Sequence, residues 1–175
     1  MPHPRNILIA YASRLGSTAE VAQTIADEIG AVARWIGDID NLAGYDAVII
    51  GSAIRYDKWL PEATDFVKTH YSTLQTMPVA IFLTCLTLSH KSPKALQQAT
   101  RYADSIATTL PHVHTAGIGQ FAGVLDYSKM PRRARLLARL VFAFLRVPEG
   151  DYRDWQAIRA WAKTTLPRIE QRKSS

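Results

Sequence analysis

The sequence of 175 residues contains one cysteine, Cys85, which excludes an internal disulfide and a cysteine-rich metal cluster. A lone cysteine is typical of a reducing compartment. No apolar run approaches the roughly 20 residues that a membrane-spanning helix needs. Met1–Asn6 leads directly into an apolar stretch, so we expect no secretory signal. These absences predict a cytoplasmic protein that binds no metal.

The common nucleotide-binding signatures are also missing, because neither GK[ST] nor GxGxxG occurs. Apolar residues make up 47% of the chain and charged residues 21%, which is enough for a packed core and argues against disorder. The length predicts one domain over residues 1–175. The net charge of +6 indicates an anionic partner.

The segment 7–18, ILIAYASRLGST, is the strongest local signal. An apolar strand, Ile7–Tyr11, is followed by a polar loop and then by apolar residues at helical spacing. Unpaired N–H groups at a helix N-terminus suit a phosphate, and glycine permits close approach. The same loop can equally serve to cap the helix. The candidate phosphate ligands are Ser13, Arg14, Leu15, Gly16, Ser17 and Thr18.

Strands and helices alternate along the chain, which predicts a parallel sheet with helices on both faces. Ligands of such sheets bind beyond the carboxyl ends of the strands. Three hydroxyl-bearing loops follow expected strands there, at 13–18, 52–59 and 84–90. Tyr56 and Trp59 in the second loop are suited to stack on a flat ring, or alternatively to pack within the protein. We therefore expect a phosphorylated ligand with a flat ring.

The opening strand with SRLGST, together with YDAVIIGSAIRY and VAIFLTCL, resembles the flavodoxin-like family. The family's phosphate loop has the form [ST]-x-[ST]-G-x-T. Ser13, Gly16 and Thr18 match it, whereas Leu15 replaces the middle hydroxyl. The resemblance implies an α/β doubly wound sandwich with a five-stranded parallel sheet in the order 2-1-3-4-5, and FMN as cofactor.

A narrower likeness is to the menaquinone-dependent protoporphyrinogen IX dehydrogenases. It is carried by IGSAIRYDKWLPEATDFVKTH, by FAGVLDY and by a long insertion before the closing helix. It implies that the flavin performs the redox chemistry, so no catalytic side chain is expected. Carried over by position, residues 13–18 bind the FMN phosphate. The ring contacts are Ser52, Ala53, Ile54, Arg55, Tyr56, Thr84, Cys85 and Leu86. For Cys85 we expect a buried apolar role without redox activity.

The insertion, residues 126–150, holds six basic residues against two acidic ones. Its sequence MPRRARLLARLVFAFLRV predicts an amphipathic helix with a basic face and an apolar face. The apolar face can pack on the domain or a second subunit, or can lie on a membrane through residues 127–149. Nucleic acid is disfavoured because aromatic residues are not interleaved with the basic ones. The candidate substrate or membrane contacts are Trp59, Arg132, Arg133, Arg135 and Arg139.

The function expected from the resemblance is oxidation of protoporphyrinogen IX, in heme biosynthesis, with electrons passed to a membrane quinone. The enzyme would be cytoplasmic and peripheral on the inner face of the cell membrane. One alternative is a flavodoxin-type electron carrier or an NAD(P)H/quinone reductase, although the basic net charge argues against a carrier. A second alternative is a flavin-free membrane or protein-binding module, for which Leu15 is the only indication. The sequence leaves the oligomeric state open.

Overall fold

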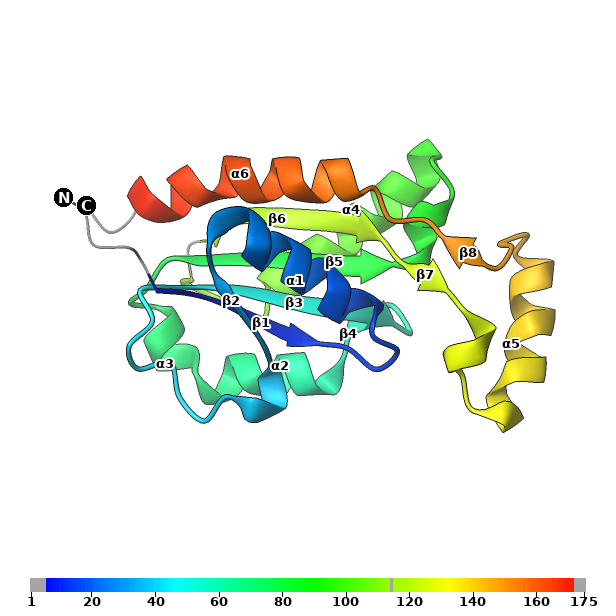
Figure 1. The fold of residues 1–175 in the computed structure, drawn as a ribbon, viewed down its shortest axis with the longest axis horizontal. Helices are drawn as coiled ribbons and strands as arrows, with labels where there is room; N and C mark the ends of the chain where they lie inside the picture. Colours follow the sequence, from blue (N-terminus) through cyan, green and yellow to red (C-terminus); the bar gives the residue numbers. More distant parts are fainter. Residues whose placement is uncertain (1–5, 114, 172–175) are drawn as a thin grey trace.

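The computed structural model describes residues 6–113 and 115–171 (Figure 1). The main strands are β1 (Ile7–Ala12), β2 (Val32–Trp35), β3 (Ala47–Arg55), β5 (Val79–Cys85) and β6 (Thr115–Ala122). The short strands are β4 (Lys58–Trp59), β7 (Val124–Leu125) and β8 (Gly150–Asp151). The helices are α1 (Ser17–Ile29), α2 (Pro61–Thr69), α3 (Tyr71–Leu74), α4 (Pro93–Ala107), α5 (Arg132–Phe144) and α6 (Trp155–Gln171), with 3-10 turns η1 (Ile36–Asp38), η2 (Leu86–Ser89) and η3 (Tyr127–Lys129).

The five main strands form a parallel sheet in the order β2-β1-β3-β5-β6. This confirms the predicted fold class and the predicted order of the five expected strands. Side chains alternate between the faces, so Leu8 and Ile50 belong to one core with α2 and α4. Ile9 and Ile49 belong to the other core, with α1 and α6. Figure 1 shows the sheet between these helix layers.

Three strands extend further than their apolar runs predicted. Residues 52–55, 84–85 and 119–122 were expected in loops but belong to β3, β5 and β6. The reason is that ladder pairing does not require apolar side chains: Ser52 pairs with Ala12 and with Leu83, and Thr84 pairs with Phe121. The rim of the sheet is therefore more rigid than a set of loops.

The apolar spacing of Trp155, Ile158 and Trp161 predicts a closing helix from about Asp154 to Leu166. In the structure α6 continues to Gln171. Pro167 removes one helical hydrogen bond. The helix nevertheless continues, because Ile169 is fully buried against the α1 side of the sheet.

The sequence also predicts a frayed tail from Gln171 to Ser175, but Gln171 is the last residue of α6, and the rest of that segment lies outside the described residues. Met1–Arg5 and the expected strand start at His114 lie outside them as well.

The expected insertion corresponds to η3, α5 and the chain leading to β8. The antiparallel pair β7–β8 closes its base. Leu125, Tyr127 and Val147 form a small core there, against which Leu86 and Phe142 pack. In Figure 1 the insertion lies at the right, beyond the carboxyl ends of the parallel strands. It therefore stands beside the edge at which the sequence predicts a ligand.

Candidate cofactor site at the carboxyl edge of the sheet

The loop between β1 and α1 turns at Gly16, whose φ of 91° lies in the left-handed region that favours glycine. Its N–H donates to Ser13 Oγ at 3.1 Å. Among the described residues no side chain caps the α1 N-terminus. The first N–H groups of this 13-residue helix thus remain available to an anion, since they have no partner within the helix.

Thr18 and Thr84 join the first loop to the end of β5. Both side chains are buried, and their hydroxyl oxygens lie 2.8 Å apart. A buried hydroxyl pair of this kind holds two backbone segments in fixed register. Neither hydroxyl is exposed, so the pair acts on the shape of the site and presents little surface to a ligand.

The second loop is a two-residue β-hairpin between β3 and β4. Tyr56 and Asp57 have φ of 50° and 62°, the left-handed conformations of a tight hairpin turn. Tyr56 is 85% exposed, and the Arg55 guanidinium lies 5.3 Å from its ring centre. The exposed ring is free to cover a flat ligand.

The hairpin is fixed from behind by α4. The Tyr102 hydroxyl donates to Asp57 Oδ1 at 2.5 Å and lies 3.4 Å from Thr87 Oγ1 in η2. Burial, and secondarily the bond to Asp57, raises the pKa of Tyr102. One hydroxyl thus links the hairpin to the third rim segment. The sequence prediction did not assign Tyr102 to the site, because its position in the sequence fits the buried face of a helix.

Several residues that the sequence predicts to contact the ligand have side chains buried inside the protein. Trp59 is 6% exposed and belongs to the α2–α4 core, so the structure favours its packing role over stacking on a ligand. Ser52 is buried, and its Oγ accepts from the Leu60 N–H at 3.1 Å, which closes the hairpin onto α2. Cys85 is buried as well, and that burial raises the pKa of its thiol. Ala53, Ile54 and Leu86 are half-buried at the same rim.

Arg14 and Leu15 lie on the outer side of the phosphate loop. The Arg14 guanidinium pairs with Glu62 of α2 at 3.0 Å, and both side chains are largely exposed. Main-chain hydrogen bonding, together with Arg14, lowers the pKa of Glu62. Leu15 is 37% exposed. Arg14 thus joins the first loop to the helix that follows the hairpin.

Arg153 fixes the other side of the phosphate loop and was missed by the sequence prediction. Its side chain is only 6% exposed and pairs with Glu20 at 2.7 Å and with Asp151 at 2.6 Å. It also donates to the Ser17 carbonyl at 3.3 Å. The hydrogen bonds from Arg153 hold the pKa of Asp151 below its ordinary value. No motif marks this residue, because the two partners that join it to the phosphate loop, Ser17 and Glu20, are remote in sequence.

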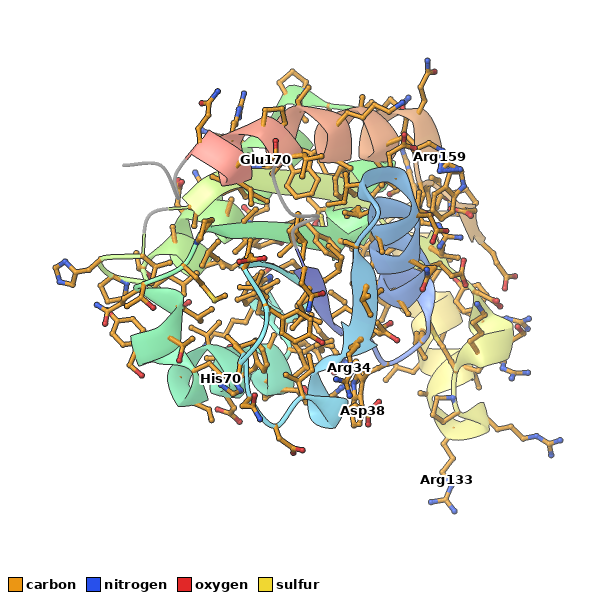
Figure 2. All side chains as sticks on the ribbon, turned by 60° about the vertical axis from the view of Figure 1, so that its left-hand side comes forward. Arg34, Asp38, His70, Arg133, Arg159 and Glu170 are labelled. Carbon is orange, nitrogen blue, oxygen red and sulfur yellow. The ribbon has the colours of Figure 1, made fainter. Side chains whose placement is uncertain are left out.

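The arginines of α5 differ in their surroundings. Arg135 donates to the carbonyls of Ser128 and Met130, so its guanidinium stabilises the insertion. Arg139 lies over the Tyr127 ring, 5.4 Å from its centre. Arg132 and Arg133 are exposed, and Figure 2 shows Arg133 pointing away from the body of the protein.

The apolar face of α5 is turned to solvent. Only Ala138 and Phe142 of this helix pack against the small core of the insertion. The face consists of side chains that are between 45% and 88% exposed, namely Leu136, Leu137, Leu140, Val141 and Phe144. In the described structure this face therefore does not pack on the domain.

The three rim segments together provide uncapped N–H groups, hydroxyls, an exposed aromatic ring and half-buried apolar side chains. This set of groups fits a phosphate monoester joined to a flat ring, as in FMN. Within residues 6–113 and 115–171, no group of three His, Cys, Asp or Glu side chains is placed to bind a metal ion. The same residues include no helix with the length and apolar character to cross a bilayer.

Comparison with known families agrees with this geometry. The family model described as "Flavodoxin domain" matches residues 8–150. That range includes all three rim segments and the whole insertion, residues 126–150. The match extends from the start of β1 to the start of β8.

Two relatives share the greater part of the chain. Protoporphyrinogen IX dehydrogenase [quinone] of Leishmania major is 27% identical, and the alignment covers 89% of this chain and 72% of the relative. The protein of the same name from Escherichia coli strain K12 is 26% identical, with coverage of 89% and 92%.

Solved structures match in fold. A WrbA-like flavodoxin from Agrobacterium tumefaciens superposes with a TM-score of 0.52 at 13% identity and covers 95% of this chain and 98% of its own. A short-chain flavodoxin associated with a bacterial microcompartment gives 0.55 at 9% identity, with coverage of 94% and 97%.

Proposed function

We propose, from the premise that this chain belongs to the flavodoxin family, that it is an FMN-dependent oxidoreductase acting on protoporphyrinogen IX with a membrane quinone as acceptor. The observation that supports it most is the convergence of three segments at one edge of the sheet: the uncapped α1 N-terminus, the Tyr56 hairpin and η2. The names of the two relatives support the substrate and the acceptor.

In this proposal residues 13–18 bind the FMN phosphate. The Tyr56 ring and the main chain of residues 52–56 contact one side of the flavin ring. Leu86 and the main chain of the buried Thr84 and Cys85 contact the other. FMN, when bound, supplies the electron-accepting chemistry. The chain binds and orients the reactants, and the buried pair of Thr18 and Thr84 keeps the rim in register.

We also propose that α5 contacts the membrane from the cytoplasmic side. Its exposed apolar face contains two rows of side chains at helical spacing, Leu136–Leu140–Phe144 and Leu137–Val141. The helix contains four arginines and no acidic residue. An apolar face beside basic side chains is typical of helices that lie on anionic lipid. Such contact would bring the cofactor edge close to a membrane-dissolved quinone.

The test is a visible absorption spectrum of the purified chain, followed by anaerobic assay with protoporphyrinogen IX and menaquinone. We expect a bound flavin spectrum and oxidation of the porphyrinogen that requires the quinone. A chain that stays colourless after incubation with FMN would refute every flavin-dependent activity and leave the flavin-free module. A flavin-loaded chain that does not oxidise the porphyrinogen would indicate an electron carrier or an NAD(P)H/quinone reductase.

A further inference from the structure

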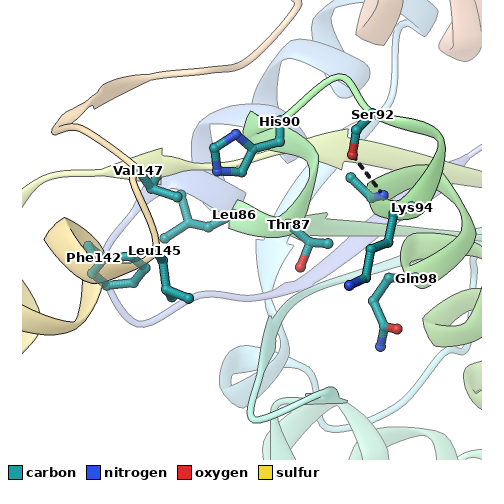
Figure 3. A pocket seen from close by; sticks show the side chains of 10 residues that line it. Leu86, Thr87, His90, Ser92, Lys94, Gln98, Phe142, Leu145 and Val147 are labelled. Carbon is teal, nitrogen blue, oxygen red and sulfur yellow. Dashed lines mark hydrogen bonds between the residues drawn. The ribbon is translucent and has the colours of Figure 1, made fainter.

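A cavity of about 500 Å³ lies between η2, the N-terminal part of α4 and the end of α5 (Figure 3). This volume is in the range of small-molecule sites. One wall comes from the insertion, through Phe142, Leu145 and Val147. The cavity therefore combines residues of the insertion with residues of the doubly wound fold.

The cavity is adjacent to the proposed flavin site. Leu86 lines it and directly follows β5, whose last residues Thr84 and Cys85 belong to the cofactor rim. Thr87, also in the lining, lies 3.4 Å from the Tyr102 hydroxyl that fixes the hairpin. A molecule in the cavity would thus lie next to the segment that we expect to contact the flavin ring.

The lining has two chemically distinct sides. The insertion and Leu86 provide apolar surface, while η2 and α4 provide polar groups. Figure 3 shows Leu145 and Phe142 on one side and Lys94 and Gln98 on the other. No lining residue is acidic, and in the part of the chain that the structure describes Lys94 forms no ion pair. The polar side therefore has a cation without a counter-ion.

We infer that this cavity binds the carboxylate-bearing edge of the porphyrinogen, with a propionate on the Lys94 ammonium and a pyrrole ring against Leu145 and Phe142. The inference rests on the proposed function. A neutral quinone carbonyl can only accept a hydrogen bond from the ammonium, whereas a carboxylate also neutralises its charge and so forms the stronger, charge-assisted pair. The sequence analysis named arginines of α5 as candidate substrate contacts. Neither Arg132 nor Arg133 lines the cavity, however, and Arg135 bonds to the main chain.

The test measures binding of protoporphyrin IX and of its neutral dimethyl ester to the full-length chain by the Soret absorbance change. Lys94→Gln should weaken binding of the diacid about tenfold and leave the ester within twofold. Lys91→Gln removes the same charge three residues away, outside the lining, and should change neither the affinity for the diacid nor the affinity for the ester. Lys94→Arg should restore most of the diacid affinity. Thermal unfolding of each variant checks the fold.

A matched pair of variants tests the apolar side of the cavity. Leu145→Ser should weaken binding of both porphyrins, whereas Phe144→Ser, which changes a more exposed neighbour outside the lining, should not. Two results with a wild-type chain that binds protoporphyrin IX would overturn the assignment of the cavity while the proposed function stands. In one, Lys94→Gln binds protoporphyrin IX as tightly as the wild type does. In the other, Lys94→Gln loses as much affinity for the dimethyl ester as for the diacid. If the flavin-loaded wild type neither binds protoporphyrin IX nor oxidises its porphyrinogen, both fail.

Discussion

At the scale of single residues, Gly16 is the position on which phosphate binding depends most. Its φ of 91° is strained for any residue with a Cβ, although a Cβ there would meet no atom within 4 Å. A substitution therefore acts through the backbone, at a cost of about 1–2 kcal/mol, rather than through a clash. The consequence is a shift of the α1 N-terminus.

We predict that Gly16→Ala lowers FMN affinity at least about tenfold, because the first N–H groups of α1 no longer converge. Gly44→Ala is the matched control, since Gly44 has φ of 83°, equally open space and a position outside the three rim segments. Both variants should lose similar thermal stability, and only Gly16→Ala should lose FMN. Titration of apoprotein by quenching of FMN fluorescence measures this; equal affinity of the two variants would contradict it.

Tyr102 connects α4 to the cofactor rim through its hydrogen bond to Asp57. Tyr102→Phe deletes the bond to Asp57 and should cost about 1 kcal/mol of unfolding free energy. It should also weaken FMN binding by freeing the hairpin. Phe is matched in shape, so both effects report on the hydroxyl alone. Tyr71→Phe, which removes a hydroxyl that donates to the Pro111 carbonyl outside the three rim segments, is the control and should leave FMN affinity unchanged.

The contribution of the Tyr102 hydroxyl to the free energy of unfolding should decrease at alkaline pH. The folded state raises the pKa of Tyr102 above its ordinary value of 10.0, first by burial. The stabilisation is therefore complete below that value and is lost as pH rises through the folded pKa. The difference in unfolding free energy between wild type and Tyr102→Phe should be constant up to about pH 9 and should shrink as pH rises above the ordinary tyrosine pKa of 10.0. A difference that grows at alkaline pH would refute the role of the hydroxyl.

At the scale of elements, the strands and helices and the two helix layers followed from the sequence, because apolar runs and helical spacing are local signals. The strand order followed only from the resemblance to the flavodoxin-like family. The ends of β3 and β5 did not, because Ser52 and Thr84 are buried polar residues whose partners, Leu60 and Thr18, are remote in sequence. For the same reason the sequence analysis missed the ion pair between Arg153 and Glu20 of α1. The sequence predicted which side chains form the apolar and the basic face of α5. It did not predict whether the apolar face points toward the domain or toward solvent.

The outward face of α5 gives a prediction for lipid. The double substitution Leu136→Ser/Leu140→Ser should lower flotation with anionic vesicles of phosphatidylglycerol more than tenfold, since each buried leucine contributes about 1.5–3 kcal/mol. Leu96→Ser on α4 is the control, because Leu96 is 57% exposed and lies outside the insertion. The wild type should bind neutral phosphatidylcholine vesicles much less.

Two outcomes would contradict a membrane role for α5. One is equal flotation of the wild type and the double variant. The other is a dimer in lipid-free solution that the double substitution dissociates, which would assign the face to a second copy of the chain. Size-exclusion chromatography with light scattering distinguishes the dimer from the monomer.

At the scale of the whole molecule, one edge of the sheet gathers the phosphate loop, the hairpin, η2 and the insertion (Figure 1). The location of this edge followed from the sequence through the rule for open parallel sheets. The cavity beside it did not, because its two walls come from segments about 50 residues apart, 86–98 and 142–147, and neither contains a recognisable motif. The parts of the site that depend on tertiary packing become visible only in the structure.

The central claim is that the three rim segments bind one phosphorylated flavin. The most direct measurement is calorimetric titration of the flavin-free chain with FMN and, separately, with riboflavin, which has the same ring and no phosphate. We predict one FMN per chain and riboflavin affinity at least about a hundredfold lower, because charge-assisted phosphate contacts each contribute about 1.5–3 kcal/mol. Equal affinities for the two, or no binding of FMN, would contradict the account.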